Sequence, residues 1–454
     1  MSDSSSPRSA DELFTLTETA LAAAKGFGAE ATDAVASRSA SLSVEVRLGK
    51  LETVERSESA SLGLRVMIGR QQAGAATSDL RPSAIRELAE RVTAMAKAAP
   101  EDPYCGLAPT ELLGKNSTDL QLYDPFVPTA EDLEARAAAT ENAALAIKGV
   151  TNSSGAEASW GEGDGVFAAS NGFRGAWRAS SHGLGVSVIA GDGAQGMERD
   201  YEGRGARWRE DLPTPESIGV KAGERAASRL GSRKLDSQKA TVIFDRRVSG
   251  GIVGSTLGAI SGGAVARGVS FLKDKLGQQI FDSSINLVDD PSRPRSFGAR
   301  AFDGEGVPGV KRNLIENGVL TTWLLNCAAA RQLGLQTTGH ASRGVGSPPG
   351  IESNNVHLPA GAESIEQMMK RVGKGLYVIE SFGPSLNSNT GDYSAGVAGF
   401  WFENGAIAYP VSEITVAGNM LDIYRRLVPA SDLEFRGGLN TPSILVEDLT
   451  IAGQ

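Results

Sequence analysis

The residues able to bind a metal ion or to act as an acid or base are few and widely spaced. Histidine occurs only at positions 182, 340 and 357. A zinc hydrolase needs imidazoles that converge on one ion. The nearest pair, His340 and His357, instead flanks the loop-like segment HASRGVGSPPGIESNNVH. The spacing therefore favours three ordinary polar histidines over a metal site.

Phosphate-binding and nucleophile motifs are equally incomplete. Gly258 and Gly263 have the spacing of a phosphate-binding loop, but Ala264 and Val265 follow where the motif needs Lys and Ser or Thr. Residues 270–273 match S-x-x-K, a short pattern that arises by chance, and no K-T-G accompanies it. The motifs therefore identify no catalytic, cofactor-binding or metal-binding residue.

The segment GGIVGSTLGAISGGA, residues 250–264, is unusual for a helix, because glycine recurs every four residues at 250, 254, 258 and 262. Each interior glycine costs a helix up to about 1 kcal/mol relative to alanine. An apolar stripe beside the glycines nevertheless predicts a helix, formed by Val253, Leu257, Ile260 and Ala264. We expect the glycine side to admit close packing against a strand of this chain, an extended peptide or a partner subunit.

The first half of the chain alternates helical and strand patterns. Residues 1–10 are predicted to form a flexible tail, followed by a helix over 11–24. Period-two alternation then predicts strands, through Leu42, Val44, Val46 and Leu48 and through Leu62, Leu64, Val66 and Ile68. A helix precedes Pro100, a Pro- and Gly-rich connection covers 100–127, and Thr129 caps a helix over 129–147. These elements predict an α+β domain over 11–234.

From about residue 150 onward the sequence is richer in hairpin signals. Asn-Gly or Asp-Gly pairs between apolar runs indicate tight turns, and they occur at 171–172, 192–193, 317–318 and 404–405. Helices are predicted over 214–231 and 321–333, and at Ser364, where Gln367 completes a capping box. We therefore expect the α+β N-terminal domain to be followed by a mainly antiparallel β domain, residues 235–454, that carries a few helices.

Composition excludes several classes of protein. A net charge of −9 and the absence of basic runs argue against nucleic-acid binding. The polar N-terminus lacks the apolar core of a secretory signal, and no apolar run reaches membrane-spanning length. The two cysteines, Cys105 and Cys327, are too few for a disulfide framework. These features predict a soluble cytoplasmic protein.

Several long stretches, in order along the chain, carry a resemblance to a known family. They include SNGFRG, SVIAGDGAQGMERDYEG, DDPSRPRSFGARAFDGEGVPGVKRNLIENGVL and ESFGPSLNSNTGDYSAGVAGFWFENGAIAYPVSEITVAGNM, and the end TPSILVEDLTIAG. Over nearly its whole length the chain resembles the TldD/PmbA family, and within it the PmbA (TldE) branch. The resemblance implies a cytoplasmic zinc metallopeptidase of two related subunits, acting on extended or unfolded peptides and on precursors of peptide antibiotics.

In the TldD branch, a helix corresponding to the glycine-rich segment carries HExxxH, and a cysteine near the C-terminus completes the zinc site. By this resemblance, the two histidine positions fall on Gly254 and Ala259, and the glutamate position falls on Ser255. The C-terminal segment DLEFRGGLNTPSILVEDL has no cysteine. We therefore expect no zinc or other cofactor in this chain, and a degenerate metal-site helix over 250–268 that shapes the peptide cavity of a TldD-like partner holding the zinc.

The sequence leaves two alternative functions open. The chain could be a stand-alone hydrolase that uses His340, His357 or Cys327, or a non-catalytic peptide-binding or regulatory protein, a class to which the family's historical label of DNA gyrase modulator belongs. A homodimer is possible beside the predicted heterodimer. Three further residues, Arg343, Asn354 and Asn355, lie in a polar loop and are more simply explained as solvated, so we do not assign them as site residues.

Overall fold

The computed structural model describes residues 10–114, 119–193 and 196–453. Its helices and largely antiparallel strands confirm the α+β fold class. The predicted tail, residues 1–10, lies outside the described residues except for Ala10, which begins α1 (Ala10–Gly26). Among the described residues, no helix is both long enough and apolar enough to cross a membrane.

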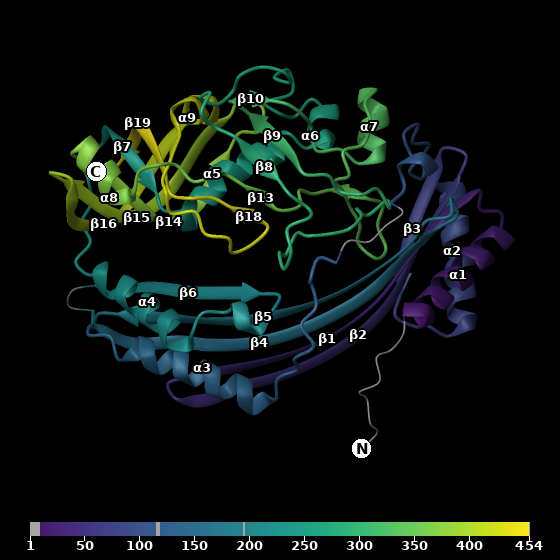
Figure 1. Ribbon diagram of the computed structural model, residues 1–454, viewed down its shortest axis with the longest axis horizontal. Coiled ribbons are helices and arrows are strands. Elements are labelled where there is room, and N and C mark those ends of the chain that lie inside the picture. The colour runs from purple at the N-terminus through teal and green to yellow at the C-terminus, as the bar shows by residue number, and fades with distance from the viewer. Residues whose placement is uncertain (1–9, 115–118, 194–195, 454) are drawn as a thin grey trace.

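A six-stranded antiparallel sheet in the order β3-β2-β1-β4-β5-β6 dominates the first half. Its strands are β1 (Ala31–Arg47), β2 (Lys50–Ile68), β3 (Gln71–Thr77), β4 (Val150–Ala169), β5 (Arg174–Ala190) and β6 (Glu198–Ala206). Figure 1 shows these long strands as a curved layer, with the second half of the chain lying over its hollow side.

One face of this sheet is covered by helices. They are α1, α2 (Pro82–Ala98), α3 (Ala130–Leu145) and α4 (Pro215–Ser228). Even-numbered positions of β1, such as Ala34, Ala36 and Val44, are buried against these helices, as the alternation predicts. Leu48, which the same pattern placed in a strand, instead lies exposed in the turn between β1 and β2 with a φ of 48°. Odd-numbered positions such as Asp33 and Val35 face the second half of the chain.

The second half contains a sheet that closes on itself. Its strands pair in the order β16 (Ala406–Asn419), β15 (Asp392–Glu403), β14 (Gly375–Leu386), β7 (Gln238–Phe244) and β19 (Ile444–Ala452). The sheet closes because β16 also pairs with β19. The short β17 (Val428–Pro429) joins β19. The pairing of β14 with β7 is parallel. Its strands come from distant parts of the sequence, so this closure follows from tertiary packing.

A second, smaller sheet packs beside the closed one. Its order is β10 (Val319–Leu320), β9 (Arg312–Glu316), β8 (Leu287–Asp289), β13 (Val356–His357) and β18 (Leu439–Asn440), and β11 (Ala341–Ser342) pairs separately with β12 (Gly350–Ile351). The helices of this half are α5 (Arg246–Ala259), α6 (Gly262–Ala266), α7 (Cys327–Leu333), α8 (Ile365–Val372) and α9 (Met420–Arg426). Two single turns of 3₁₀ helix lie in the first half, at Thr110–Leu112 and Arg209–Asp211.

Turn and cap signals are confirmed where they are local. Asn317-Gly318 and Asn404-Gly405 both have two positive φ angles and join adjacent antiparallel strands. Both capping boxes form, Thr129 with Asp132 and Ser364 with Gln367. The helix predicted over 321–333 is wrong before residue 327, because the backbone of Leu324 pairs with Ile260 and Gly262 and keeps that segment extended.

The helix predicted over 250–268 is also wrong in its bounds. Asp245 caps its start by accepting a hydrogen bond from the Arg247 amide at 2.9 Å, so α5 begins earlier, at Arg246. It ends at Ala259, whose carbonyl accepts a bond from the Ser270 hydroxyl at 2.7 Å. The chain then bends, and α6 is a separate short helix.

Buried ion pairs join the first sheet to the second half. Asp200 of β6 is 2% exposed, and its Oδ1 lies 2.9 Å from Nη2 of Arg247 on α5. Arg229, at the end of α4, lies 3.5 Å from Asp200 Oδ2 and 2.5 Å from Glu380 Oε2 on β14. The relative placement of the two halves is therefore set by charged groups as well as by apolar contact.

Candidate functional site

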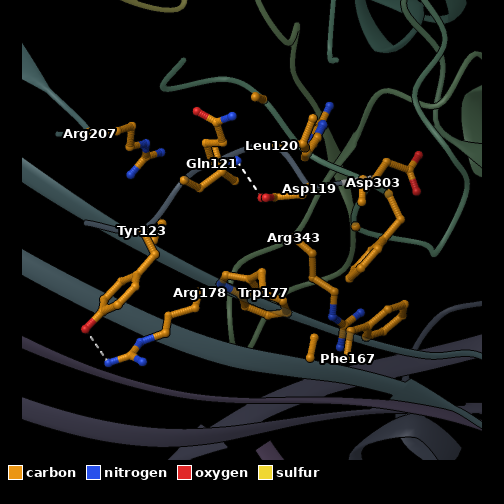
Figure 2. Close-up of a pocket in the computed structure, with 18 of the residues that line it drawn as sticks. Asp119, Leu120, Gln121, Tyr123, Phe167, Trp177, Arg178, Arg207, Asp303 and Arg343 are labelled. Carbon is orange, nitrogen blue, oxygen red and sulfur yellow. Dashed lines mark hydrogen bonds between the residues drawn. The ribbon is translucent and has the colours of Figure 1, made fainter. Parts of the chain in front are cut away.

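A cavity of about 840 Å³ lies between the hollow side of the first sheet and the second half of the chain. Its lining comes from separate segments: Val35, Asp119–Tyr123, Phe167, Ala176–Ala179, Arg207, Trp208, Ala299–Gly304, Ser342 and Arg343. Figure 2 shows aromatic and arginine side chains gathered around this space. Its size is in the range of about 300–1,000 Å³ typical of small-ligand sites.

The segment 119–124 forms one wall by running along the first part of β5, which β6 leaves unpaired. The Ser180 amide donates to the Leu122 carbonyl at 2.9 Å, and the Asp124 amide donates to the Ser180 hydroxyl at 2.8 Å. The Trp208 indole N–H donates to the Gln121 carbonyl at 2.7 Å. These bonds hold the indole against the wall and fix the segment relative to the sheet.

Four arginines line the cavity, and each is held differently. Arg178 donates to the Tyr123 hydroxyl at 2.6 Å and pairs with Glu162 at 3.1 Å, the first contact being drawn in Figure 2. In the described part of the chain, the hydrogen bonds of Arg207 go to two carbonyls, those of Ser180 and Phe297, both at 3.0 Å. Burial lowers the pKa of Arg207. Within the described residues, no carboxylate lies within ion-pair distance of Arg207.

Arg300 and Arg343 form the opposite wall. Arg300 donates to the Asn354 side-chain oxygen and, at 3.0 Å, to the Ala341 carbonyl. Arg343 pairs through Nη2 with Oδ1 of Asp33, and both side chains are almost completely buried. Arg65 on β2 binds the other oxygen of Asp33, with Nε at 2.8 Å. Two buried guanidinium groups therefore share one buried carboxylate.

Two buried acids belong to this region: Asp303 lines the cavity, and Glu305 lies two residues further along the chain. The Asp303 carboxylate accepts hydrogen bonds from the backbone amides of Glu305, Val307 and Ala341 at 2.8–3.0 Å. Glu305 accepts a bond from the Cys327 amide at 2.8 Å. Burial is the main cause that raises the pKa of both acids. These carboxylates stabilise the backbone and are not free to act on a ligand.

The loop residues considered in the sequence are buried in a polar network. His340 is 1% exposed; its Nε2 lies 2.6 Å from Asp289 Oδ2, and its Nδ1 lies 2.8 Å from the Thr338 hydroxyl. The Asn354 amide donates to the same Asp289 oxygen at 2.8 Å. Asn355 is also buried and donates to the Asp290 carbonyl at 3.0 Å. The expectation of solvated Arg343, Asn354 and Asn355 is therefore wrong.

The other candidates for a stand-alone hydrolase are His357 and Cys327. His357 is half-buried against the Phe435 ring, and burial lowers its pKa. Cys327 is buried, and burial together with Glu305 raises the pKa of its thiol. A raised pKa disfavours the thiolate that a cysteine nucleophile requires. His182 is buried too, with Nε2 3.2 Å from Asp124 Oδ2.

The three positions aligned with a zinc motif lie on α5. Gly254 has no side chain, and a Cβ there would lie 3.3 Å from Leu439 Cδ2. The Ser255 hydroxyl lies 2.6 Å from the hydroxyl of Tyr424 and donates to the Ile252 carbonyl at 2.5 Å. Ala259 is buried in the core. This set contains no imidazole, thiol or carboxylate, so the residues present do not fit the family's zinc ion.

The glycines of this helix do not pack as closely as expected. An added Cβ would meet nothing within 4 Å at Gly251 or Gly258, whereas at Gly262 it would lie 2.4 Å from Leu325 Cδ2 and 2.9 Å from the Leu324 carbonyl oxygen. Close packing therefore explains Gly262 on α6. It does not explain Gly251 and Gly258, which are exposed on α5.

This difference predicts opposite effects of alanine on the two helices. Gly251→Ala should raise the free energy of unfolding by about 0.5–1 kcal/mol, because alanine loses less backbone entropy in a helix. Gly262→Ala should lower it, because its methyl group collides with Leu324 and Leu325. Urea unfolding midpoints measure both changes. A fall with Gly251→Ala as large as that with Gly262→Ala would show that α5 packs against something else.

Comparison with known proteins finds matches along most of the chain. The three family models of the PmbA/TldA metallopeptidases match it in order: domain 1 over residues 32–96, the central domain over 123–230 and the C-terminal domain over 237–453. The metalloprotease PmbA of Escherichia coli O157:H7 is 39% identical over 96% of this chain and 94% of that protein. The chain belongs to the PmbA/TldD metallopeptidase family.

A second curated relative and two solved structures are also similar to this chain over nearly its whole length. The metalloprotease PmbA homolog of Haemophilus influenzae is 36% identical over 94% of this chain and 93% of that protein. A crystal structure from Bacteroides thetaiotaomicron, named as a proposed modulator of DNA gyrase, has a TM-score of 0.91 at 26% identity and covers 98% of this chain and 99% of that one. TldE from Thermococcus kodakarensis shares the fold, with a TM-score of 0.86 at 21% identity and coverage of 96% and 99%. The resemblance to the PmbA branch is therefore confirmed.

Sequence patterns gave no indication of the cavity. Its walls come from at least six segments, and its arginines have no common spacing. The one usable signal is the polar loop that contains Arg343, for which the sequence predicts a solvated surface. The cavity lies apart from α5, whose residues do not line it. Within the described residues, no group of three or more His, Cys, Asp or Glu side chains is placed to bind a metal ion.

Proposed function

We propose that this chain is the PmbA/TldE-type subunit of a cytoplasmic zinc metallopeptidase complex. Its partner is a TldD-like chain that carries HExxxH and the zinc, and the complex hydrolyses extended peptides, including precursors of peptide antibiotics. The observation that carries the proposal is α5, where Gly254, Ser255 and Ala259 stand at the motif positions. The role of this chain is then to complete the substrate cavity of the partner.

An uncovered strand edge supports the need for a partner. β2 pairs with β1 from Lys50 onward, but β3 covers only Leu62–Ile68, so within the described residues 50–61 have no strand on their outer side. Leu48, Leu51 and Val54 near this edge are 53%, 48% and 49% exposed. Soluble proteins rarely leave a long strand edge with apolar side chains uncovered, because it promotes association.

The proposal is tested by capture of the tagged chain from its own host, followed by mass spectrometry. We expect a chain with HExxxH to be recovered at close to one-to-one stoichiometry. The purified pair should hydrolyse an unstructured peptide, removal of zinc with a chelator should abolish the activity, and each chain alone should be nearly inactive.

A matched control separates the two subunits. Replacing the motif glutamate of the partner with glutamine should abolish hydrolysis, whereas Ser255→Ala in this chain should leave it nearly unchanged, because no catalytic role falls on that hydroxyl. Recovery of this chain only with copies of itself, together with peptide hydrolysis by the lone chain, would contradict the proposal and favour a stand-alone hydrolase.

A further inference from the structure

The cavity between the two halves has a charge that differs from that of the whole chain. The protein carries a net charge of −9, yet among the described residues four arginines and two aspartates line this space. The Asp303 carboxylate is already bound to three backbone amides. Asp119 accepts a bond from the Gln121 amide at 2.8 Å. The free hydrogen-bonding capacity of the cavity is therefore mainly that of cationic donors.

Arg343 is the least satisfied of these cations. Its side chain is 3% exposed, and one nitrogen pairs with Asp33, which is shared with Arg65. The other two nitrogens, Nε and Nη1, have no hydrogen-bond partner in the described part of the chain. Buried polar groups almost always have a partner, so two buried and unpartnered donors on a side chain beside a cavity indicate a missing acceptor. Figure 2 shows this guanidinium beside Phe167, among the lining residues.

Aromatic rings from separate segments also line the cavity. Trp177 is 39% exposed and lies edge-on to Phe302 with ring centroids 6.4 Å apart. Trp208 is held by its bond to Gln121, and Phe302 packs against Phe173 at 5.0 Å. Rigid aromatic rings near arginine donors that have no hydrogen-bond partner suit a ligand with an apolar side chain next to an anionic group.

We propose that this cavity binds the C-terminal end of a peptide, with the terminal carboxylate at Arg343 and an apolar side chain among Trp177, Trp208 and Phe302. The choice of a peptide rests on the proposed function, whereas the choice of a carboxylate rests on the arginine donors. The site is distinct from α5, because no residue of that helix lines the cavity.

The test uses isothermal calorimetry on the full-length chain alone, with N-acetyl-Ala-Ala-Phe as a free acid or as its C-terminal amide. We expect the acid to bind at least about tenfold more tightly, which corresponds to one charge-assisted hydrogen bond of about 1.4 kcal/mol or more. Equal affinity for acid and amide, or binding of neither, would overturn the proposal.

Two further probes define the class of ligand. 3-Phenylpropanoate carries the same ring and carboxylate without the peptide, and phenyl phosphate replaces the carboxylate with a phosphate. Both should bind more weakly than the acid peptide. Equal binding of 3-phenylpropanoate would assign the cavity to small aromatic acids, and tighter binding of phenyl phosphate would assign it to phosphorylated ligands. Either result would overturn the assignment to a peptide terminus.

Variants locate the site. Arg343→Met should weaken binding of the acid at least about tenfold and leave the amide unaffected, whereas Arg91→Met, an exposed charge on α2, should change neither. A second variant, Ala179→Trp, serves in case Arg343→Met fails to fold. Ala179 pairs with Gly163, lies on the same face of β5 as Trp177 and lines the cavity. Its replacement by tryptophan therefore fills the cavity without removing a charge. Unchanged binding in Ala179→Trp would overturn the proposal.

These binding experiments do not depend on whether the chain associates with a TldD-like partner. If the chain never associates with a TldD-like protein but still binds the acid peptide, the proposed function fails and the cavity assignment stands. If the pair forms and hydrolyses peptides, but the lone chain binds the acid and the amide with equal affinity, the cavity assignment alone fails.

Discussion

Replacing Asp33 with alanine is expected to lower the free energy of unfolding by about 3–5 kcal/mol, because loss of one partner leaves buried charges uncompensated. Asp33 is fully buried, and it is the carboxylate that Arg65 and Arg343 share. Urea unfolding at neutral pH, followed by circular dichroism, measures the change through the transition midpoint and its slope.

Asp79→Ala is the matched control, since Asp79 pairs with Arg81 on the surface. An exposed pair contributes little to stability, so the midpoint should hardly move. The double variant Asp33→Ala with Arg343→Met should recover part of the lost stability, because it removes one of the two uncompensated charges. A midpoint for Asp33→Ala close to that of Asp79→Ala would show that the two arginines find other partners.

Gly63→Ala is expected to displace the loop that carries Arg343 and to destabilise the protein by about 1–3 kcal/mol or more. A Cβ at Gly63 would lie 1.4 Å from the Val345 carbonyl oxygen and 2.3 Å from its carbon. These are backbone atoms, which no rotamer change can move. The loop must therefore shift away from β2, and the contact of Arg343 with Asp33 should weaken.

Limited proteolysis with trypsin gives a direct measurement of that displacement, because cleavage after Arg343 requires the loop to be accessible. We expect faster cleavage there in Gly63→Ala than in the unaltered protein. Gly163→Ala, also on a strand of the first sheet, is the control: its Cβ would be 3.6 Å from the nearest atom, the Arg38 carbonyl oxygen. Equal cleavage rates in the two variants would contradict the predicted displacement.

Local features of the fold were predictable from sequence because few residues decide them. Asn317-Gly318 forms the expected turn since both residues tolerate positive φ angles. The cap at Thr129 needs only Asp132, three residues away. The helix predicted over 321–333 failed because a backbone pairing with Ile260 holds Leu324 extended, and a contact between such distant segments leaves no periodic signal.

The candidate site was predictable only in part. The substitutions at Gly254, Ser255 and Ala259 were visible because a motif with fixed spacing can be compared position by position. The cavity was not, because burial of Arg343 depends on Asp33, Gly63 and the strands that hold them. A charged residue in a Pro- and Gly-rich stretch is ordinarily exposed, and only the folded chain shows that this one is not.

The sharing of Asp33 between a near and a distant arginine also bears on biosynthesis. Arg65 leaves the ribosome soon after Asp33, so the first sheet can neutralise this carboxylate while the chain is still growing. Arg343 emerges only when most of the chain has been made. Until the segment around Phe302 has also been made, Val35, Phe167 and Phe173 lack part of their apolar cover on the nascent sheet. That interval is when the protein would depend most on chaperones, because exposed apolar surface on a partly folded chain promotes aggregation.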